Sequence, residues 1–472
     1  MEPLPELPAR VEEVTERGEE HALREISIAF VGELRGEIEP CGCPTLPYGG
    51  FARRQSLLSR MEAELDRPLL HVDAGEALRK GLVHDPGGDT KERAELILEL
   101  LRLSGVQAYV PGPTDLATVG LEGLKGSGLP LISATWEPFP ATMVVEEQGI
   151  RVGLIGLSAK AEGVEGFDPV EATRAALADL PEVDVTVAVS NLGDRENLRV
   201  AEEVSGLGLI LATRGSSHDS PRNGGRCAVI EVPDRGRYVE IAHLWLMSGT
   251  DQPVRVDEGF HGDFAQYDEA RRARNRTGRE TPGDGEIALR VGLEERGRGR
   301  NLVSVEERPL GSELDDVSVV SERLDLWREE RMTLARAVVA AEPVEYFPSY
   351  ATAAGCTSCH SKQFARFGFT EHRNGGSTLM REGRHNDPEC LTCHTTGFGQ
   401  PGGFAETDPT SMRKWGGVQC EACHGPLAGH PREQRAVPAQ VDETTCLRCH
   451  DEANSPNFDY STYLLEVICP TG

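Results

Sequence analysis

The sequence predicts an α/β domain built of layers, followed by a segment of short helices and irregular structure. From about residue 24 to 260, short aliphatic runs alternate with helix-like segments and Gly-rich turns. From 348 to 472, aliphatic residues are sparse and Gly, His and Cys are abundant. The first pattern is typical of α/β layers, whereas the second segment lacks the apolar side chains for a core of its own.

Strands of the first region are expected where β-branched and aliphatic residues follow one another. These runs are 26–31, 69–72, 108–110, 131–134, 152–157, 185–190, 209–212, 227–232 and 238–246. Helices are expected between several of them, for example over 53–65 and 91–103. Gly and Asp residues concentrate at the strand ends, which is where the loops of such folds carry function.

Residues 261–347 differ from both flanking regions. The stretches 271–279 and 294–300 are rich in Arg and Gly, and they predict an exposed connector with interspersed secondary structure. Within it, apolar residues at helical spacing over 321–341 predict a packing helix that joins the two halves. The sequence thus divides into domains at 24–260, 261–347 and 348–472.

Four Cys-x-x-Cys-His motifs dominate the last quarter of the chain. Their residues are Cys356, Cys359 and His360; Cys390, Cys393 and His394; Cys420, Cys423 and His424; and Cys446, Cys449 and His450. This motif is the signature of covalent c-type haem attachment, in which the two thiols bind the porphyrin and the histidine becomes the proximal iron ligand. Paired Cys-x-x-Cys units also suit zinc, but a zinc site gives no reason for the fifth residue. Four covalently attached c-type haems are therefore expected.

Three further histidines are available as distal iron ligands in this segment: His372, His385 and His430. Each has the alternative of being a surface side chain or a propionate contact. Three histidines complete bis-His ligation on three haems only. The fourth haem then takes a ligand from the N-terminal region or keeps an open position, which substrate chemistry at iron requires.

Residues 354–458 resemble a known family. The sequence around Cys420, Trp-Gly-Gly-Val-Gln-Cys-Glu-Ala-Cys-His-Gly-Pro, is similar to an element of the tetrahaem cytochromes of ammonia oxidisers. The resemblance implies closely stacked haem pairs and one five-coordinate iron. Related chains carry a histidine near the C-terminus, where this one has Ile468, Cys469 and Pro470. Cys469 is either a soft axial ligand or a surface or disulfide-bonded thiol.

Residues 26–246 resemble metallophosphoesterases of the 5'-nucleotidase kind, on the Gly-Gly-Phe-Ala-Arg run at 49–53 and the Asp-Ala-Gly-Glu run at 73–76. The resemblance implies a layered α/β sandwich. Its catalytic residues do not carry over, since the family's ligand positions hold Glu33, Arg35, Glu76, Asp115 and Asn191, with His218 alone surviving from a Gly-His-x-His element. A dinuclear phosphoesterase needs several such ligands around two metals. We therefore expect a retained scaffold and a lost hydrolase.

The loop after the first strand carries Cys41-Gly42-Cys43. It resembles a branch of nucleotidase-like proteins in which the second cysteine position holds selenocysteine, and the resemblance implies that Cys43 is redox-active and Cys41 resolves it. A thiolate near Arg35 or Arg53 would suit that role. The alternatives are a disulfide to Cys227 or a small metal clip. Four residues near the same strand ends are interpreted as hydrogen-bonded loop residues, with metal ligation as the alternative: His71, Asp73, Glu76 and His84.

The formal net charge of −28 argues against nucleic acid or an anionic membrane as partner and favours basic or membrane-bound redox proteins. No apolar run is long enough to span a bilayer. Because haem attachment takes place outside the cytoplasm, a secretory leader is expected to have been removed, since residues 1–6 do not resemble one. The expected location is the periplasm or the cell surface.

Two functional hypotheses from different classes follow. The first is an electron-transfer protein or oxidoreductase in which the tetrahaem module exchanges electrons with the Cys41/Cys43 pair. The second is an electron-relay scaffold whose N-terminal domain only binds a partner or ligand. An active metallophosphoesterase tethered to a cytochrome is the weaker third.

Overall fold

The structure is a computed structural model. It describes residues 23–40, 48–79, 90–213, 220–233, 235–247, 252–314, 318–341, 349–432, 438–450, 455 and 457–469. These form two compact units. The first comprises Met1–Arg79 and Lys91–Asp316, and the second Lys80–Thr90 and Val317–Gly472.

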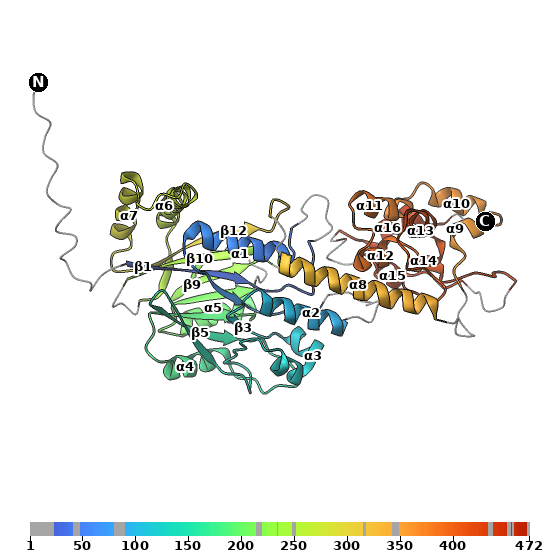
Figure 1. The fold of residues 1–472 in the computed structure, drawn as a ribbon. Helices are drawn as coiled ribbons and strands as arrows, with labels where there is room; N and C mark the ends of the chain where they lie inside the picture. Colours follow the sequence, from blue (N-terminus) through green and yellow to red (C-terminus); the bar gives the residue numbers. More distant parts are fainter. Residues whose placement is uncertain are drawn as a thin grey trace, which may run out of the picture. The chain divides into compact units, whose positions relative to one another are not determined.

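Two six-stranded sheets form the centre of the first unit (Figure 1). The first sheet runs in the order β11 (Val254–Val256), β12 (Asn301–Pro309), β10 (Tyr238–Met247), β1 (Leu23–Val31), β2 (Leu70–Asp73) and β3 (Ala108–Tyr109). The second runs β4 (Thr142–Glu147), β5 (Ile150–Leu157), β6 (Val185–Ser190), β7 (Leu209–Thr213), β9 (Cys227–Val232) and β8 (Arg222–Gly224). Strands β5, β6, β7 and β9 are parallel, with antiparallel β4 and β8 at the edges.

The main core lies between the two sheets. It joins Phe30 and Val72 of the first sheet to Leu154 and Val187 of the second. Strand β1 shows how the sequence produces this arrangement, because successive side chains of a strand point to opposite faces. Its Ile26, Ile28 and Phe30 enter the inter-sheet core, and the alternate residues Ala29 and Val31 pack on the other face.

Helices cover the outer faces of both sheets. On the first sheet, α1 (Phe51–Leu65) contributes Leu57, Leu58 and Met61. On the second, α4 (Pro169–Asp179) and α5 (Asp194–Glu203) contribute Ala176 and Val200. Between β2 and β4 the chain also forms α2 (Thr90–Leu103) and α3 (Pro113–Gly126). The predicted layered α/β sandwich is confirmed.

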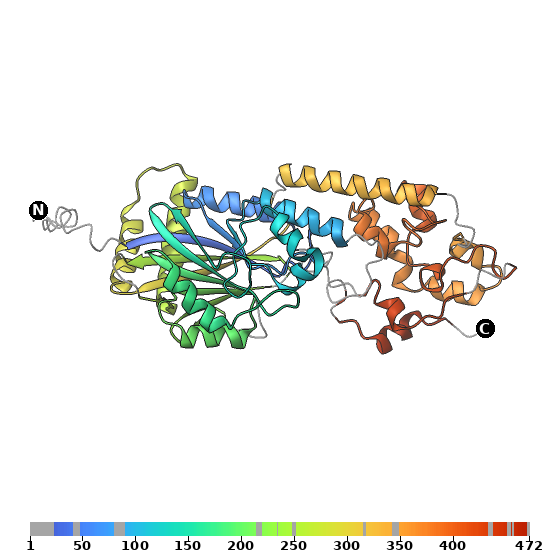
Figure 2. The same ribbon diagram turned by 90° about the horizontal axis from the view of Figure 1, so that it is seen from below.

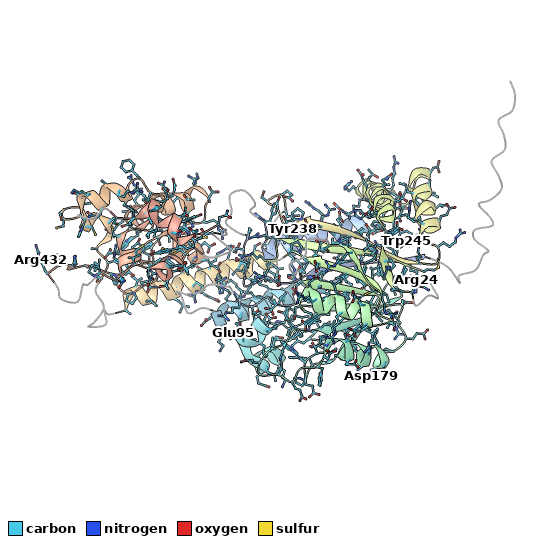
Figure 3. All side chains as sticks on the ribbon, turned by 180° about the vertical axis from the view of Figure 1, so that it is seen from behind. Arg24, Glu95, Asp179, Tyr238, Trp245 and Arg432 are labelled. Carbon is cyan, nitrogen blue, oxygen red and sulfur yellow. The ribbon has the colours of Figure 1, made fainter. Side chains whose placement is uncertain are left out.

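The segment expected to be an exposed connector contributes regular elements to the first unit. Its helices α6 (Glu258–Arg276) and α7 (Asp284–Arg296) pack through Phe260, Phe264 and Leu293, and β12 pairs with β10 over eight residues. Figure 3 shows Tyr238 and Trp245 toward the two ends of β10, the strand to which β12 adds. The sequence misled because Arg271 and Arg272 are buried in ion pairs, although their composition indicates solvent exposure.

One predicted strand, 131–134, is wrong. Only Leu131 forms a bridge, with Tyr109. The next three backbone N–H groups donate to different segments: Ile132 to Tyr109, Ser133 to Pro140 and Ala134 to Gly156. A ladder needs consecutive residues to bond to one neighbouring strand, so this aliphatic run is buried without becoming a strand.

The second unit is helical among its described residues, as predicted (Figure 2). The long helix α8 (Ser318–Ala340) matches the predicted packing helix, and its Met332 and Ala335 lie in a small core with Leu391, Phe404 and Trp415. The short helices are α9 (Thr352–Cys356), α10 (Ser361–Phe367), η2 (Glu371–Asn374), α11 (Gly375–Arg381), α12 (Pro388–His394), α13 (Pro409–Trp415), α14 (Cys420–His424), α15 (Glu443–Cys446) and α16 (Tyr460–Val467). In the described part of the chain, no helix is long and apolar enough to cross a membrane.

Candidate functional sites

Each Cys-x-x-Cys-His motif begins on a short helix. The second and third motifs lie within α12 and α14, and the first and fourth start where α9 and α15 end, at Cys356 and Cys446. Residues three and four apart lie on one face of a helix. One helical turn therefore presents two sulfurs and one imidazole together, which covalent haem attachment requires.

The imidazole rings of His372 and His450 lie close together. Their ring centroids are 6.0 Å apart, with the ring planes tilted by 40°. Two imidazole nitrogens that each bind one metal at about 2 Å place their ring centroids roughly 6 Å apart. Burial, and then the neighbouring His450, lower the pKa of His372, which favours the neutral imidazole that a metal ligand requires.

Two of the motif histidines have an oriented ring. His450 Nδ1 lies 2.8 Å from Ser455 Oγ, and His394 Nδ1 lies 3.4 Å from the carbonyl oxygen of Gly375. A hydrogen bond at Nδ1 leaves Nε2 for iron and fixes the direction of the ring, as partners of metal-binding histidines commonly do.

The other two distal candidates have different surroundings. His385 is half-buried, and its buried Nδ1 has no hydrogen-bond partner in the described part of the chain. His430 is exposed and follows α14 in a turn in which its backbone N–H donates to Leu427. His385 thus retains an unused ring nitrogen, as a ligand of an added group would.

The four motifs touch one another in a series. The Cys356 and Cys420 thiols are close enough to shift each other's pKa, so the first and third motifs are neighbours. Arg448 of the fourth motif donates from Nη2 to the carbonyl of Ala422 in the third at 2.6 Å. The Cys393 thiol of the second motif lies 3.9 Å from the carbonyl of Arg448. The contacts therefore connect the motifs in the order first, third, fourth, second.

Apolar surface around the motifs fits large apolar prosthetic groups. Phe369 is 86% exposed, Leu465 66% and Ile468 51%. All three side chains lie close in sequence to a histidine or cysteine of the candidate site. Exposure of side chains this large is unfavourable in water. Together with the neighbouring imidazoles and the unused nitrogen of His385, it fits porphyrins covalently held at the four motifs.

In the first unit, Asp115 lies where the resemblance puts a metal ligand, but its oxygens are already occupied. Oδ1 accepts the backbone N–H groups of Ala77 and Leu78, and Oδ2 accepts those of Glu76 and Gly112 together with the hydroxyl of Tyr109. All five distances are 2.9–3.0 Å. Asp115 thus organises the loops after β2 and β3.

Asn191 and Asp73 are used in the same way. The Asn191 amide donates to the backbone carbonyls of Ala74, Val110 and Pro111 and accepts from Ala159. Asp73 forms a buried ion pair with Arg54, which also bonds His71 at 2.8 Å. His71 and Asp73 therefore share the Arg54 guanidinium, and Asn191 bonds backbone groups. His71 and Asp73 are hydrogen-bonded, as expected, but they lie on strand β2 and not on a loop.

Glu76 has an unusual ionisation. Burial, then the charge of Asp115, raise its pKa from 4.5 to about 7, while the hydroxyl of Thr114 donates to its carboxyl group. The unfolded chain releases this proton near pH 4.5 and the folded chain retains it to about pH 7. Stability should therefore fall as pH rises through this window, by at most about 3 kcal/mol at 1.36 kcal/mol per pKa unit.

Glu76→Gln should remove this pH dependence, because glutamine mimics the protonated acid. We expect the variant to match the wild type near pH 5 and to unfold at higher temperature than the wild type above pH 7. Calorimetry at both pH values measures the difference. Equal destabilisation at the two pH values would contradict the assignment.

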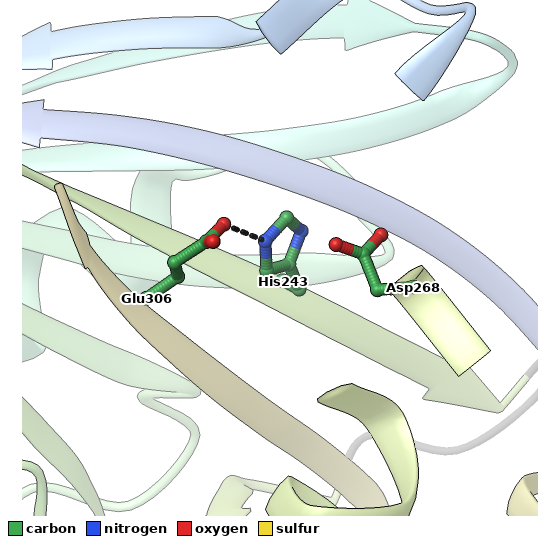
Figure 4. A group of neighbouring side chains, drawn as sticks. All are labelled: His243, Asp268 and Glu306. Atoms are coloured by element: carbon green, nitrogen blue, oxygen red, sulfur yellow. Dashed lines mark ion pairs between the residues drawn. The ribbon is translucent and has the colours of Figure 1, made fainter. Parts of the chain in front are cut away.

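His243, Asp268 and Glu306 form the tightest group of metal-type ligands in the described part of the chain (Figure 4). Their ligand atoms lie within 4.8 Å of one another, and His243 Nε2 is 3.6 Å from Glu306 Oε2. Arg272, however, bonds both carboxylates, and Arg271 bonds Asp268 as well. These guanidinium groups already neutralise the carboxylates and repel a divalent cation, so the cluster attaches α6 to β10 and β12 as an ion-pair network.

Four predicted site residues lie outside the described residues: Cys41, Cys43, His84 and His218. Cys227, the suggested disulfide partner of the Cys-Gly-Cys loop, is a free and fully buried thiol, and burial raises its pKa to about 12. A thiol of this kind is structural and unreactive.

Sequence reasoning missed the residues that connect the motifs, namely Gln419, Glu421 and Arg448, and also Ser455, which orients the His450 ring. The available signal was the acidic residue inside the third motif: a charged side chain between two haem-binding cysteines is 2% exposed here. Its partners could not be read from the sequence, because they lie about 70 residues away.

Comparisons with known proteins divide the chain in the same way. Residues 355–425 match the family model described as cytochrome c554 and c-prime. Cytochrome c-554 of Nitrosomonas europaea is 34% identical over 86 residues, which is 15% of this chain and 36% of that protein. The probable 5'-nucleotidase of Treponema pallidum is 27% identical over 238 residues, 45% of this chain and 37% of that protein. The chain thus spans little more than a third of the length of either relative.

Among solved structures, the 5'-nucleotidase precursor of Thermus thermophilus aligns with a TM-score of 0.47 at 18% identity, covering 76% of this chain and 68% of that one. The NAD nucleotidase of Haemophilus influenzae aligns with a TM-score of 0.45 at 13% identity, covering 70% and 64%. Both resemblances predicted from the sequence are confirmed by the sequence relatives. The C-terminal region of this chain is thus similar to the cytochrome c554 and c-prime family, and the N-terminal region is similar to a probable 5'-nucleotidase.

Proposed function

We propose that this protein is a tetrahaem c-type cytochrome that transfers electrons outside the cytoplasm, in the periplasm or at the cell surface. A c-type haem supplies one-electron chemistry between ferric and ferrous iron. The single observation that carries the proposal is the proximity of two imidazoles, His372 and the fourth-motif residue His450, whose ring centroids are 6.0 Å apart.

The chain's own residues would hold the four groups as follows. His360, His394, His424 and His450 are the proximal ligands, adjacent to the eight attaching cysteines. His372 is the distal partner of His450, and His385 and His430 are the candidates for two further irons. One haem then lacks a local histidine, and its second axial position is open or is filled by another residue.

Contacts between the motifs support a relay. The first and third, third and fourth, and fourth and second motifs are in direct contact, so each haem would have a neighbour within the same unit. Covalent haem attachment supports a location outside the cytoplasm. The net charge of −28 favours a redox partner with a basic docking face.

The proposal includes a redox role for Cys41 and Cys43, which exchange electrons with the haems. Two observations support it. The hydrolase ligand positions hold residues that bond the backbone, as with Asp115 and Asn191, and Cys227 is buried and unreactive. The alternative is a domain that only binds a partner or ligand, with the haems as the relay.

Haem stoichiometry and a redox titration of the full chain test these points together. We expect four haems per chain by peptide mass spectrometry, and a two-electron couple that disappears in Cys43→Ser while the haem spectra stay unchanged. Fewer than four haems would contradict the tetrahaem proposal. A redox titration of Cys43→Ser identical to that of the wild type would reject the thiol site. It would favour the alternative, in which the haems are the relay and the N-terminal domain only binds a partner or ligand. Metal-dependent phosphatase activity that survives loss of haem would favour the hydrolase instead.

A further inference from the structure

Glu421, inside the third motif, is a buried side chain that neither haem attachment nor axial ligation explains. It is 2% exposed and accepts four hydrogen bonds, all from backbone N–H groups. Ala351 donates at 2.8 and 3.0 Å, Thr352 at 2.6 Å and Leu427 at 2.8 Å. Ala351 and Thr352 are at the start of α9, the helix that carries the first motif.

The neighbouring residue Gln419 acts on the same helix. Its Oε1 accepts the N–H of Ala353 at 2.7 Å, and its amide donates to the carbonyls of Lys414 and Gly416. The first backbone N–H groups of a helix have no partner within it and require acceptors from elsewhere. Residues at the start of the third-motif helix therefore cap the first-motif helix.

The cap also holds a strained backbone. Thr352 has φ of 63°, a left-handed conformation that is costly for a β-branched residue, and it is 4% exposed. Its N–H donates to Glu421 and its carbonyl accepts from the Cys356 thiol at 3.7 Å. The strained residue thus connects the carboxylate directly to the first haem-binding cysteine, whose thiol in turn contacts Cys420.

We propose that Glu421 and Gln419 are positioning residues that hold the first and third motifs together as one pair and place a buried carboxylate beside both attachment motifs. The inference rests on the proposed attachment of haems at these two motifs. A carboxylate in a poorly solvated site stabilises ferric over ferrous iron nearby, so the two haems of this pair are held at lower potentials than they would have without it.

Glu421→Gln tests the proposal in the full chain, because it keeps the shape, removes the charge and replaces one accepting oxygen by a donor. We expect two of the haem centres to move to more positive potential in a spectroelectrochemical titration, with the other two unchanged. Glu421→Asp keeps the charge but is too short to reach both N–H groups, so it should weaken the cap with a smaller shift in potential. Glu443→Gln, an exposed change near the fourth motif, is the matched control.

Where Glu421→Gln impairs maturation, peptide mass spectrometry locates the loss. Lower haem occupancy confined to the Cys356/Cys359 and Cys420/Cys423 peptides supports the pairing. Wild-type occupancy with wild-type potentials, or equal effects on all four motifs, would overturn it. Wild-type protein analysed in parallel separates the pairing by Glu421 from the proposed function. If the first and third motifs of the wild-type protein carried no haem, the proposed function itself would be rejected.

Discussion

Replacing His372 by leucine is expected to convert one haem of the protein from low spin to high spin. Leucine fills a similar volume but offers no ligand atom, so the iron that His450 is proposed to hold would lose its proposed sixth ligand, the imidazole whose ring centroid lies 6.0 Å from that of His450. A five-coordinate iron binds carbon monoxide, which a bis-His iron does not do readily. EPR and visible spectra of the oxidised protein, and a carbon monoxide titration of the reduced protein, measure the change.

His372→Met provides the matched rescue. A thioether can replace the imidazole as a sixth ligand, and His/Met ligation raises the potential relative to bis-His ligation. We expect this variant to return to low spin and to show one centre at more positive potential. A merely structural role for His372 would not distinguish leucine from methionine in this way.

A double-mutant cycle assigns the effect to the fourth motif. Cys446→Ser/Cys449→Ser removes the haem next to His450, and in that background His372→Leu should produce no new high-spin signal. Groups that act through one partner are non-additive in this sense. A high-spin signal that persists in the combined variant would assign His372 to a different haem and contradict the interpretation of these two imidazoles as ligands of one iron.

The motifs illustrate what the sequence can predict. Cys-x-x-Cys-His is a local pattern whose chemistry depends on residues that are neighbours in the sequence, so the attachment residues could be predicted without a fold. The His372–His450 pair joins positions 78 residues apart. Composition made His372 a candidate, and only the fold brings it opposite one particular proximal histidine.

The same contrast holds in the first unit. Strand β6 is a continuous aliphatic run that is buried on both faces, and its bounds match the prediction. Strand β12 was missed because its second half carries three consecutive charged residues, Glu306, Glu307 and Arg308, and Glu306 is paired with Arg272 from α6. Charged residues that are buried in ion pairs give a packed segment the composition of a solvent-exposed one. The sequence does not show which charged residue pairs with which.

Loss of the metal ligands could be predicted, but what replaced them could not. Substitution of the family's residues by Glu76 and Asn191 predicts that a dinuclear centre is absent. That Asp115 has become the centre of a hydrogen-bond network depends on the exact course of two loops, which residue types alone do not determine.

Asp115→Ala is expected to be the most destabilising single change in the first unit. The fully buried carboxylate satisfies four backbone N–H groups and the hydroxyl of Tyr109, and alanine leaves all five donors buried without that acceptor. An unsatisfied buried donor costs about 1–3 kcal/mol, so even with partial relaxation the loss should exceed about 4 kcal/mol. That is a large fraction of the total stability of a typical domain, roughly 5–15 kcal/mol.

Asp179→Ala, at the exposed end of α4, is the matched control and should change the stability by less than about 0.5 kcal/mol. Calorimetry of the full chain, with the haem absorbance followed separately, measures unfolding of the first unit.

The network also predicts that a chelator leaves the wild-type unfolding temperature unchanged, because both oxygens of Asp115 already accept from protein donors. A chelator-induced loss of stability, restored by a divalent metal, would show that these strand-end loops still hold a metal and that Asp115 is one of its ligands.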